Sequence, residues 1–384
     1  MNNLEYATLF QTALDETIVV DLTSRGMEAN ASLVRYTGGN TCKIPKMSTD
    51  GLGDYSRKDG FPTGDITLEW ETKTLTQDRG KEFTIDAMDN DETAFVASAS
   101  NALGTFQKDH VVPEVDSYRY SKIFDEAVRN GAAFKRYTPQ AADIYTKLTD
   151  DIDAIQDIIG ENEPLVIYMS GKAYTALTHC TEWDKKIDIA DFKAGDISTK
   201  VHSVNDVPII KVPSLRMKTN YVFDAKNGYA SADYAGQINW IIMARRAAVA
   251  VVKTDIIRIF DPQTNQKTHG WLIQMRKYHD CWLFDNKINT ICVSLADESA
   301  TATGATVASG KITTTVATLP GELYYRVGTS TSPTAFKLYD EFDTDGWTKI
   351  AADETTITAS SGVYVELAVI KNGRVLEYDA QKVA

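Results

Sequence analysis

The stretch Ile66-Thr67-Leu68-Glu69-Trp70-Glu71 alternates large apolar with polar side chains. Period two is the pattern of a β-strand with one apolar face, and residues 82–85 repeat it. Four glycines and several charged residues lie between residues 50 and 64, where they favour turns. Residues 41–85 therefore predict a long β-hairpin with an elaborate tip. Its few apolar residues cannot form a core of their own, so we expect its partner to be another subunit.

A long helix is predicted after this hairpin. Asp89 or Asn90 can cap it, with Glu92 in the first turn, where the helix dipole favours negative charge. Apolar side chains then follow at helical spacing. Pro113 should kink or divide the helix, and Gly131 should end it. The result is a rod of about 40 residues, or ~60 Å.

A mixed α/β domain is predicted at residues 136–265. Thr138 would cap a helix with Pro139 at its first position, and Gly160 would end it. Ser170 would cap a second helix. Strands are predicted at residues 165–169, 207–212, 221–224 and 239–252.

Strands return after this domain. Residues 281–284 and 288–293 are apolar runs on either side of Asp285-Asn286-Lys287. This pattern predicts a second hairpin with its turn at residues 285–287.

The two ends of the chain differ in character. The pattern of residues 1–40 predicts an arm with one apolar helical face. This face needs another surface to pack against. Residues 296–310 are a linker of Ala, Ser, Thr and Gly. Short alternating runs separated by turn residues follow it, and they predict a small all-β sandwich at residues 298–384. We expect this domain to be appended to a core that is complete without it.

Composition narrows the class of protein. The chain has 384 residues, enough for two or three compact units. Its net charge of −13 argues against sequence-specific DNA reading, since such proteins present a basic face to phosphates. No targeting or membrane-spanning segment is evident, so we expect a soluble cytosolic product. Four scattered cysteines predict free thiols: Cys42, Cys180, Cys281 and Cys292.

The sequence contains no complete catalytic motif that we recognise. Ser170-Gly171-Lys172-Ala173 resembles part of a phosphate-binding loop but lacks its Ser/Thr and its upstream Gly. The run His279-Asp280-Cys281 brings three reactive residue types together, yet structural roles in a strand explain it better. We therefore predict no catalytic residue, no cofactor site and no enzyme.

One weak metal candidate remains. Glu341, Asp343 and Asp345 precede Gly346 with the spacing of a calcium loop. The twelfth position is Ala352, where such a loop requires a bidentate Glu. A hairpin turn at Asp345-Gly346 is the competing interpretation.

The order of these segments resembles the Hong Kong 97-like major capsid proteins of tailed phages. Three stretches carry the resemblance: residues 83–93 (FTIDAMDNDET), residues 111–119 (VVPEVDSYR), and residues 278–280 (YHD) with residues 284–287 (FDNK). Together they place roughly residues 1–295 within the family's fold.

The resemblance implies an α+β fold with six parts. They are an N-terminal arm (1–40), an extended β-loop (41–85), a spine helix with peripheral domain (86–135), an axial domain (136–265), peripheral return strands (266–297) and an Ig-like C-terminal β-domain (298–384) on the outer surface. Residues implied in assembly are Arg57, Lys58, Trp70, Glu92, Pro113 and Asp285.

The same resemblance implies a function. The chain would self-assemble as pentamers and hexamers into an icosahedral phage head enclosing double-stranded DNA. Its partners would be other copies of itself, a separate scaffolding protein, a portal protein and packaged DNA through non-specific contacts, with no membrane. It would reside in the virion after assembly in the host cytoplasm.

Two alternatives stay open. An encapsulin-type nanocompartment shell shares the fold and would enclose an enzyme instead of DNA. A carbohydrate-binding or hydrolytic protein would use the β-domain as a sugar-binding module. Its stacking residues would be Trp347, Tyr324 and Tyr325, although such aromatic side chains more often form the core of a small β-domain.

Overall fold

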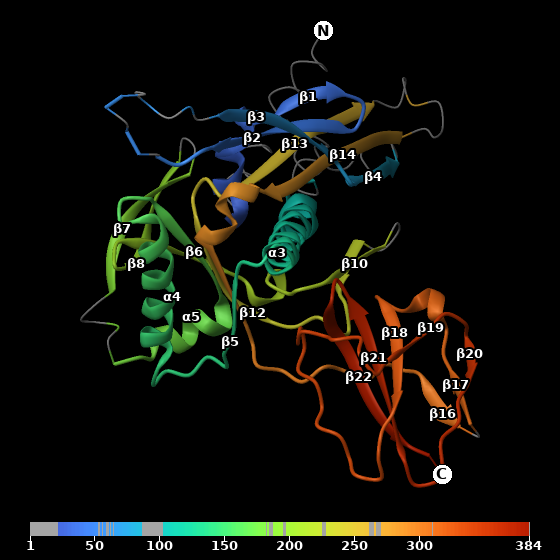
Figure 1. Ribbon diagram of the computed structural model, residues 1–384. Coiled ribbons are helices and arrows are strands. Elements are labelled where there is room, and N and C mark those ends of the chain that lie inside the picture. Colours follow the sequence, from blue (N-terminus) through green and yellow to red (C-terminus); the bar gives the residue numbers. More distant parts are fainter. Residues whose placement is uncertain are drawn as a thin grey trace.

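The computed structural model describes residues 22–52, 54–55, 57–58, 61, 63, 65–86, 103–181, 183, 187–194, 197–224, 228–260, 265, 270–308 and 310–383. Sheets of seven and three strands, a hairpin sheet and a long helix form one body, and a β-sandwich adjoins it (Figure 1). This architecture is mixed α+β, as predicted. The expected helix start at Asp89 or Asn90, and with it Glu92, lies outside the described residues.

The seven-stranded sheet has the order β5-β15-β12-β6-β9-β8-β7. Its central strands β6 (Leu165–Ser170) and β12 (Ile238–Ala244) are buried along their whole length, because helices pack on the sheet. Strands buried on both faces are apolar throughout. The other elements are β5 (Ala133–Arg136), β7 (Ile187–Ala194), β8 (Ile197–Val204), β9 (Val207–Val212), β15 (Ile291–Leu295), α4 (Ile144–Ile159) and α5 (Gly171–Thr178).

Helix α4 begins later than predicted. Thr138 does not cap it, because residues 137–143 form a loop closed by the Tyr137 side chain. The Tyr137 hydroxyl donates to Asp143 Oδ1 at 2.6 Å and accepts from the Gln140 N–H at 3.0 Å. The end at Gly160 is as predicted, with a φ of +82°. The predicted cap of α5 is also confirmed, since Ser170 Oγ accepts from the Ala173 N–H at 3.4 Å.

A three-stranded antiparallel sheet, in the order β13-β14-β4, lies beside the long helix (Figure 1). Its strands are β4 (Gln77–Asp86), β13 (Ala248–Phe260) and β14 (Gly270–Leu283). The predicted hairpin at residues 281–293 is wrong. β14 is a central strand with both edges already paired, and the 3₁₀ turn η4 (Asp285–Thr290) carries the chain on to β15 in the other sheet.

The predicted domain boundaries do not follow the sheets. The single strand expected at residues 239–252 is two strands, β12 and β13, which belong to different sheets. The segment predicted as return strands, residues 266–297, likewise supplies β14 to one sheet and β15 to the other. Apolar runs in two fully buried strands look alike, so the sequence pattern could not separate them.

The predicted hairpin forms a third sheet. It consists of β1 (Arg35–Gly38), β2 (Thr41–Thr49) and β3 (Ile66–Thr74). The alternating stretch at residues 66–71 lies in β3 and pairs with β2 from Thr41↔Thr74 to Thr49↔Ile66. The second alternating stretch, residues 82–85, is also a strand, but it lies in β4 and pairs with β14.

The spine helix continues through Pro113. A π-helical turn, η2 (Gln107–Val111), leads directly into α3 (Val112–Arg129). Proline has no N–H to bond the carbonyl four residues earlier, and wider helical turns accommodate such a defect. The expected division of the helix does not occur. The helix ends before Gly131, which has a φ of +80°, as predicted.

Residues 1–21 of the predicted arm lie outside the described residues, and the segment that follows them is not a free arm. It is the 3₁₀ segment η1 (Thr23–Leu33), and Met27 inserts into the main core beside side chains of α3. Asp116 in α3 accepts hydrogen bonds from the backbone N–H groups of Thr23 and Ser24 at 3.2 and 3.0 Å. This part of the arm therefore packs on its own subunit.

The predicted C-terminal sandwich is confirmed. Its sheets have the orders β16-β17-β20 and β19-β18-β21-β22, and they enclose a separate apolar cluster. The strands are β16 (Thr306–Ala308), β17 (Lys311–Thr313), β18 (Glu322–Val327), β19 (Thr348–Ile350), β20 (Glu354–Thr356), β21 (Tyr364–Lys371) and β22 (Arg374–Lys382), with the 3₁₀ turn η5 (Val316–Thr318). The remaining elements lie in the body: η3 (Ser214–Arg216), β10 (Tyr221–Asp224) and β11 (Gly228–Ser231).

The core of the body is not complete without this domain. Leu338, Tyr339 and Leu376 are buried in the main core cluster. Tyr339 meets Phe124 of α3 edge-on, with ring centroids 5.2 Å apart. Its hydroxyl accepts from Asn220 Nδ2 at 2.7 Å, while its backbone has a φ of +65°. A bulky side chain in this left-handed region carries strain, which the surrounding contacts hold in place.

Candidate assembly surface

The hairpin presents an apolar face to solvent. Directly opposed residues of an antiparallel pair lie on the same face, and the pairs Pro45↔Trp70, Met47↔Leu68 and Thr49↔Ile66 are two residues apart. Met47, Leu68 and Ile66 are 56%, 58% and 72% exposed. Large apolar side chains gathered on an exposed strand face mark a contact site or an aggregation hazard.

The apolar character continues at the tip. Leu52, Tyr55 and Phe61 are all exposed, and the rings of Tyr55 and Phe61 contact each other with centroids 5.0 Å apart. Figure 1 shows the chain between β2 and β3 extending past the rest of the body at the upper left. Among the described residues, none outside the hairpin covers these side chains.

The base of the hairpin is packed on its own subunit. Cys42 and Ile44 in β2 are buried in a cluster with Val249 and Val251 of β13 and Trp282 of β14. Beyond Ile44, Lys46 and Met47 of β2 are exposed. The hairpin is therefore an arm with an anchored base and an uncovered apolar end.

The predicted assembly residues lie in three places. Arg57 and Lys58 are exposed at the hairpin tip. Trp70 is half-buried on the apolar face, and the Arg35 guanidinium lies over its ring at 4.7 Å. Asp285, in η4, forms an ion pair of 2.8 Å with Lys46 at the point where the hairpin leaves the body.

The other two predicted residues are not on this surface. Pro113 lies in the spine helix, and Glu92 lies outside the described residues. The structure therefore places Trp70 and Asp285 close to the point where the hairpin leaves the body, and it places Arg57 and Lys58 at the hairpin tip. An assembly role for any of them stays a prediction.

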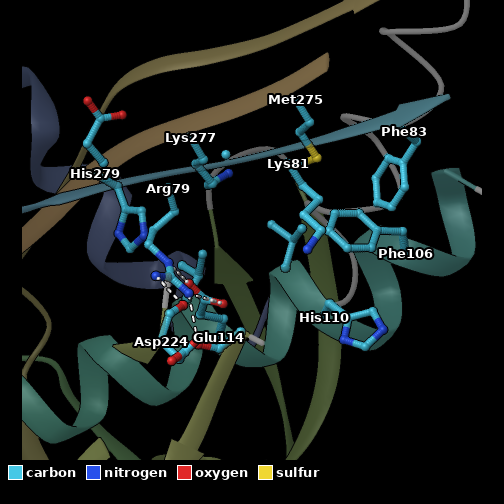
Figure 2. A pocket seen from close by; sticks show the side chains of 15 residues that line it. Arg79, Lys81, Phe83, Phe106, His110, Glu114, Asp224, Met275, Lys277 and His279 are labelled. Carbon is cyan, nitrogen blue, oxygen red and sulfur yellow. Dashed lines mark hydrogen bonds and ion pairs between the residues drawn. The ribbon is translucent and has the colours of Figure 1, made fainter. Parts of the chain in front are cut away.

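A cavity of about 490 Å³ lies between β4, β14 and the helix at residues 106–115 (Figure 2). One wall is apolar and includes Phe83, Phe106 and Met275. On the opposite wall, Arg79 pairs with Glu114 at 2.6 Å and donates to the Gly228 carbonyl at 2.9 Å. Arg79 thus joins β4 to the spine helix and to the first residue of β11.

The reactive residues near this cavity are poorly suited to catalysis. His279 is buried, and burial together with the positive charge of Arg119 holds its pKa well below the usual range. Burial raises the pKa of the Cys281 thiol strongly, so this thiol stays protonated. A neutral imidazole and a buried thiol do not form an activated nucleophile.

The calcium candidate does not gather into a ligand set. Glu341 pairs with Arg374 at 3.1 Å, and Asp343 Oδ1 accepts from the Asp345 N–H at 3.0 Å. Gly346 has a φ of +74°, as a tight turn requires. Within the described part of the chain, no group of three His, Cys, Asp or Glu side chains is arranged to hold a metal ion.

The proposed sugar-stacking aromatics pack within the β-domain. Trp347 and Tyr324 pack against one apolar cluster of the domain, and Tyr325 packs against the other. Trp347 is covered further by the Arg326 guanidinium, which lies 4.6 Å from its ring centroid. A flat, open aromatic platform is therefore not formed by these residues.

Sequence reasoning missed several buried charges of the body. Arg119 is fully buried in α3 and donates to Ser24 Oγ at 3.1 Å and to Glu28 at 2.6 Å. Asp116 is also fully buried and pairs with Arg216 at 3.2 Å. The sequence contains no signal for these buried charges, since single charged residues in an amphipathic helix usually face solvent.

Comparison with known proteins gives fold similarity without sequence similarity. Neither the protein-family models nor the curated protein sequences include a match to this chain. The structure is similar to the capsid of cyanophage P-SCSP1u at 11% identity and a TM-score of 0.47, covering 68% of this chain and 85% of that chain. The mature capsid of bacteriophage PhiM1 gives 10% identity and a TM-score of 0.46, covering 67% and 82%.

A virus-like particle from Pyrococcus furiosus is similar at 15% identity and a TM-score of 0.41, covering 77% of this chain and 100% of that chain. All three TM-scores lie below 0.5. No helix among the described residues combines the length and apolar character of a bilayer span.

Proposed function

We propose that this chain is the shell subunit of a tailed-phage capsid, and that its hairpin binds a neighbouring copy of the same chain. The observation that carries the proposal is the exposed apolar face of Met47, Leu68 and Ile66 on an arm whose base is anchored. The segment order of arm, hairpin, spine helix and two sheets supports it, since it is the order that the resemblance to the capsid family implies.

The energetics favour a many-copy assembly. Burying one large apolar side chain contributes about 1.5–3 kcal/mol. The three exposed side chains of the hairpin face would give several kcal/mol per subunit, from which the cost of association is subtracted. One such contact is weak. A closed shell repeats the same contact in every subunit, so the free energies of all these contacts add up.

The finer points of the proposal follow from the capsid resemblance. Pentamers and hexamers would build an icosahedral head around double-stranded DNA, with help from a scaffolding protein and a portal protein. The net charge of −13 supports only non-specific DNA contact. The C-terminal domain would lie outside the shell, because an added domain would crowd the DNA side. Assembly would take place in the host cytoplasm, and the product would be part of the virion.

Electron microscopy of the purified protein tests the proposal. The wild type should form closed shells, whereas Leu68→Asp should remain as unassembled subunits, because a charge on the apolar face loses its contact and must be desolvated. A loss of ~3 kcal/mol per contact raises the assembly threshold by more than about 100-fold. Leu68 is exposed, so the melting temperature of the subunit should not change.

A matched control uses the opposite face of the same strand. Thr67 is the neighbour of Leu68 and is exposed on the polar face of β3. Thr67→Asp adds the same charge and should leave assembly intact. A wild type that stays monomeric at high concentration, or equal assembly of both variants, would contradict the proposal.

The encapsulin-type alternative predicts the same shells but a different content. The exposed hairpin face supports the phage capsid and the nanocompartment equally. Purified particles that contain nucleic acid favour the phage capsid, whereas particles that enclose an enzyme and no nucleic acid favour the nanocompartment.

A further inference from the structure

The Asp280 carboxylate, on the central strand β14, is fully buried. Its Oδ2 accepts from the backbone N–H of Thr76 at 2.8 Å and from Thr76 Oγ1 at 3.0 Å. Its Oδ1 accepts from the Tyr118 hydroxyl at 2.7 Å and forms an ion pair with Lys122. One carboxylate therefore joins two chain segments that are far apart in the sequence, one with Thr76 and one with Tyr118 and Lys122.

These partners have different places in the fold. Thr76 is one of the two residues that connect β3 of the hairpin to β4 of the body. Tyr118 and Lys122 lie one turn apart in the spine helix α3. Thr76 Oγ1 and the Tyr118 hydroxyl lie 3.0 Å from each other, because both converge on the same carboxylate. Asp280 thus joins the exit of the hairpin to the spine helix.

The other connecting residue, Leu75, is held differently. It is buried in the apolar cluster at the base of the hairpin, and its N–H donates to the Asn40 carbonyl at 2.8 Å. Apolar contacts resist separation but are not directional, whereas hydrogen bonds are. The cluster around Leu75 keeps the hairpin attached, and the hydrogen bonds of Asp280 define its angle.

A carboxylate is a costly choice for stability alone. A buried ion pair often contributes no more stability than apolar residues of the same shape. Both carboxylate oxygens of Asp280 nevertheless accept hydrogen bonds, Oδ2 from Thr76 and Oδ1 from Tyr118 of the spine helix. Angular precision matters here: a hairpin of nine paired residues is about 30 Å long, so a change of about 15° at its base moves the tip by about 8 Å.

We propose that Asp280 is a positioning residue that fixes the direction in which the assembly hairpin leaves the subunit. The inference rests on the proposed shell function, in which that direction sets the angle between neighbouring subunits. When Asp280 is replaced by Asn, the hairpin keeps its base but samples a wider range of angles. Shells then form with variable size or fail to close.

The direct test measures the hairpin angle in single subunits. Spin labels at Leu52→Cys and Asp157→Cys would report the distance from the tip to helix α4, since both positions are exposed and the four native cysteines are buried. The Leu68→Asp background keeps the subunits unassembled. Asp280→Asn should widen the distance distribution by about twofold or more, because a supporting contact of the site is lost.

Asp116→Asn is the matched control. Asp116 is equally buried and lies in the spine helix that Asp280 contacts, but it binds η1 and not the hairpin exit. It should lower the melting temperature without widening the distribution. Thr76→Val removes only the Oγ1 donor and keeps the backbone N–H, so it should widen the distribution less than Asp280→Asn and covers the case in which Asp280→Asn does not fold.

The outcomes separate the two proposals. Equal widths in Asp280→Asn and Asp116→Asn, or an unchanged width in Thr76→Val and Asp280→Asn, would overturn the role of Asp280, whether or not the wild type forms shells. A wild type that never assembles would overturn the shell function while the distance measurement still tests the hairpin anchor. With assembly-competent chains, Asp280→Asn should broaden the particle diameters and Asp116→Asn should not.

Discussion

At the scale of single residues, buried polar groups connect the segments of this chain. Asp116 binds the segment before the hairpin, and Asp280 binds the exit of the hairpin. Arg136 donates from Nε and Nη2 to the Leu338 carbonyl at 3.1 Å, which joins β5 to the C-terminal domain. Each of these groups has a partner far away in the sequence, so its role depends on tertiary contacts.

Glu377 predicts a pH dependence of stability. Burial and the negative charge of Asp233 raise its pKa to about 7 from an ordinary 4.5. The folded state therefore holds this proton more tightly than the unfolded state does, so stability falls as the pH rises from about 4.5 to 7. Thermal denaturation between pH 5 and pH 8 should show a smaller loss for Glu377→Gln than for the wild type. Equal losses in both proteins would contradict this assignment.

At the scale of elements, the hairpin is the feature with the clearest sequence signal. The alternation at residues 66–71 predicted strand β3 and its apolar face, because side chains alternate across a strand whatever its partner. The partner strand β2 was not predicted as a strand, since Lys43, Pro45 and Lys46 interrupt its pattern. Pro45 is tolerated there because β1 pairs only with residues 41–43, so that β2 has a single partner strand at Pro45.

Removing the outer hairpin should separate folding from assembly. A chain in which residues 46–69 are replaced by Asn-Gly keeps Cys42 and Ile44, and hence the packed base. It should fold with a melting temperature close to that of the wild type and should form no shells. Circular dichroism and sedimentation velocity measure the two properties. Shell formation by this variant would exclude the hairpin as the assembly element.

At the scale of the whole molecule, the C-terminal domain contributes side chains to the core of the body. Leu338 lies against Gly236, where an added Cβ would come within 2.5 Å of Leu338 Cδ2. Close packing of this kind, together with the buried Tyr339, makes the two parts mutually dependent. The composition change near residue 298 indicated a separate domain, and it did not reveal this contact.

Tyr339→Ala should uncouple the two parts. Deleting a large buried aromatic side chain costs about 3–5 kcal/mol, and here the loss falls on the contact between body and domain. Calorimetry of the wild type should give one transition, and the variant should unfold at lower temperature in two. Tyr55→Ala is the control, because Tyr55 is exposed at the hairpin tip. Two transitions in the wild type would show that the contact is too weak to couple them.

The sequence by itself determined the local structure of this protein: the exposed strand face at residues 66–71, the end of α4 at Gly160, the cap at Ser170 and the C-terminal β-sandwich. Each of these features depends either on the periodicity of the side chains or on the conformational preference of a single residue. Both properties are local in the sequence. Only the tertiary structure decided that β14 joins β13 and β4, that β15 crosses to the other sheet, and that Asp280 and Tyr339 connect distant segments. These strand pairings and long-range contacts depend on which buried surfaces pack together. An apolar run in the sequence does not specify the strand with which it pairs.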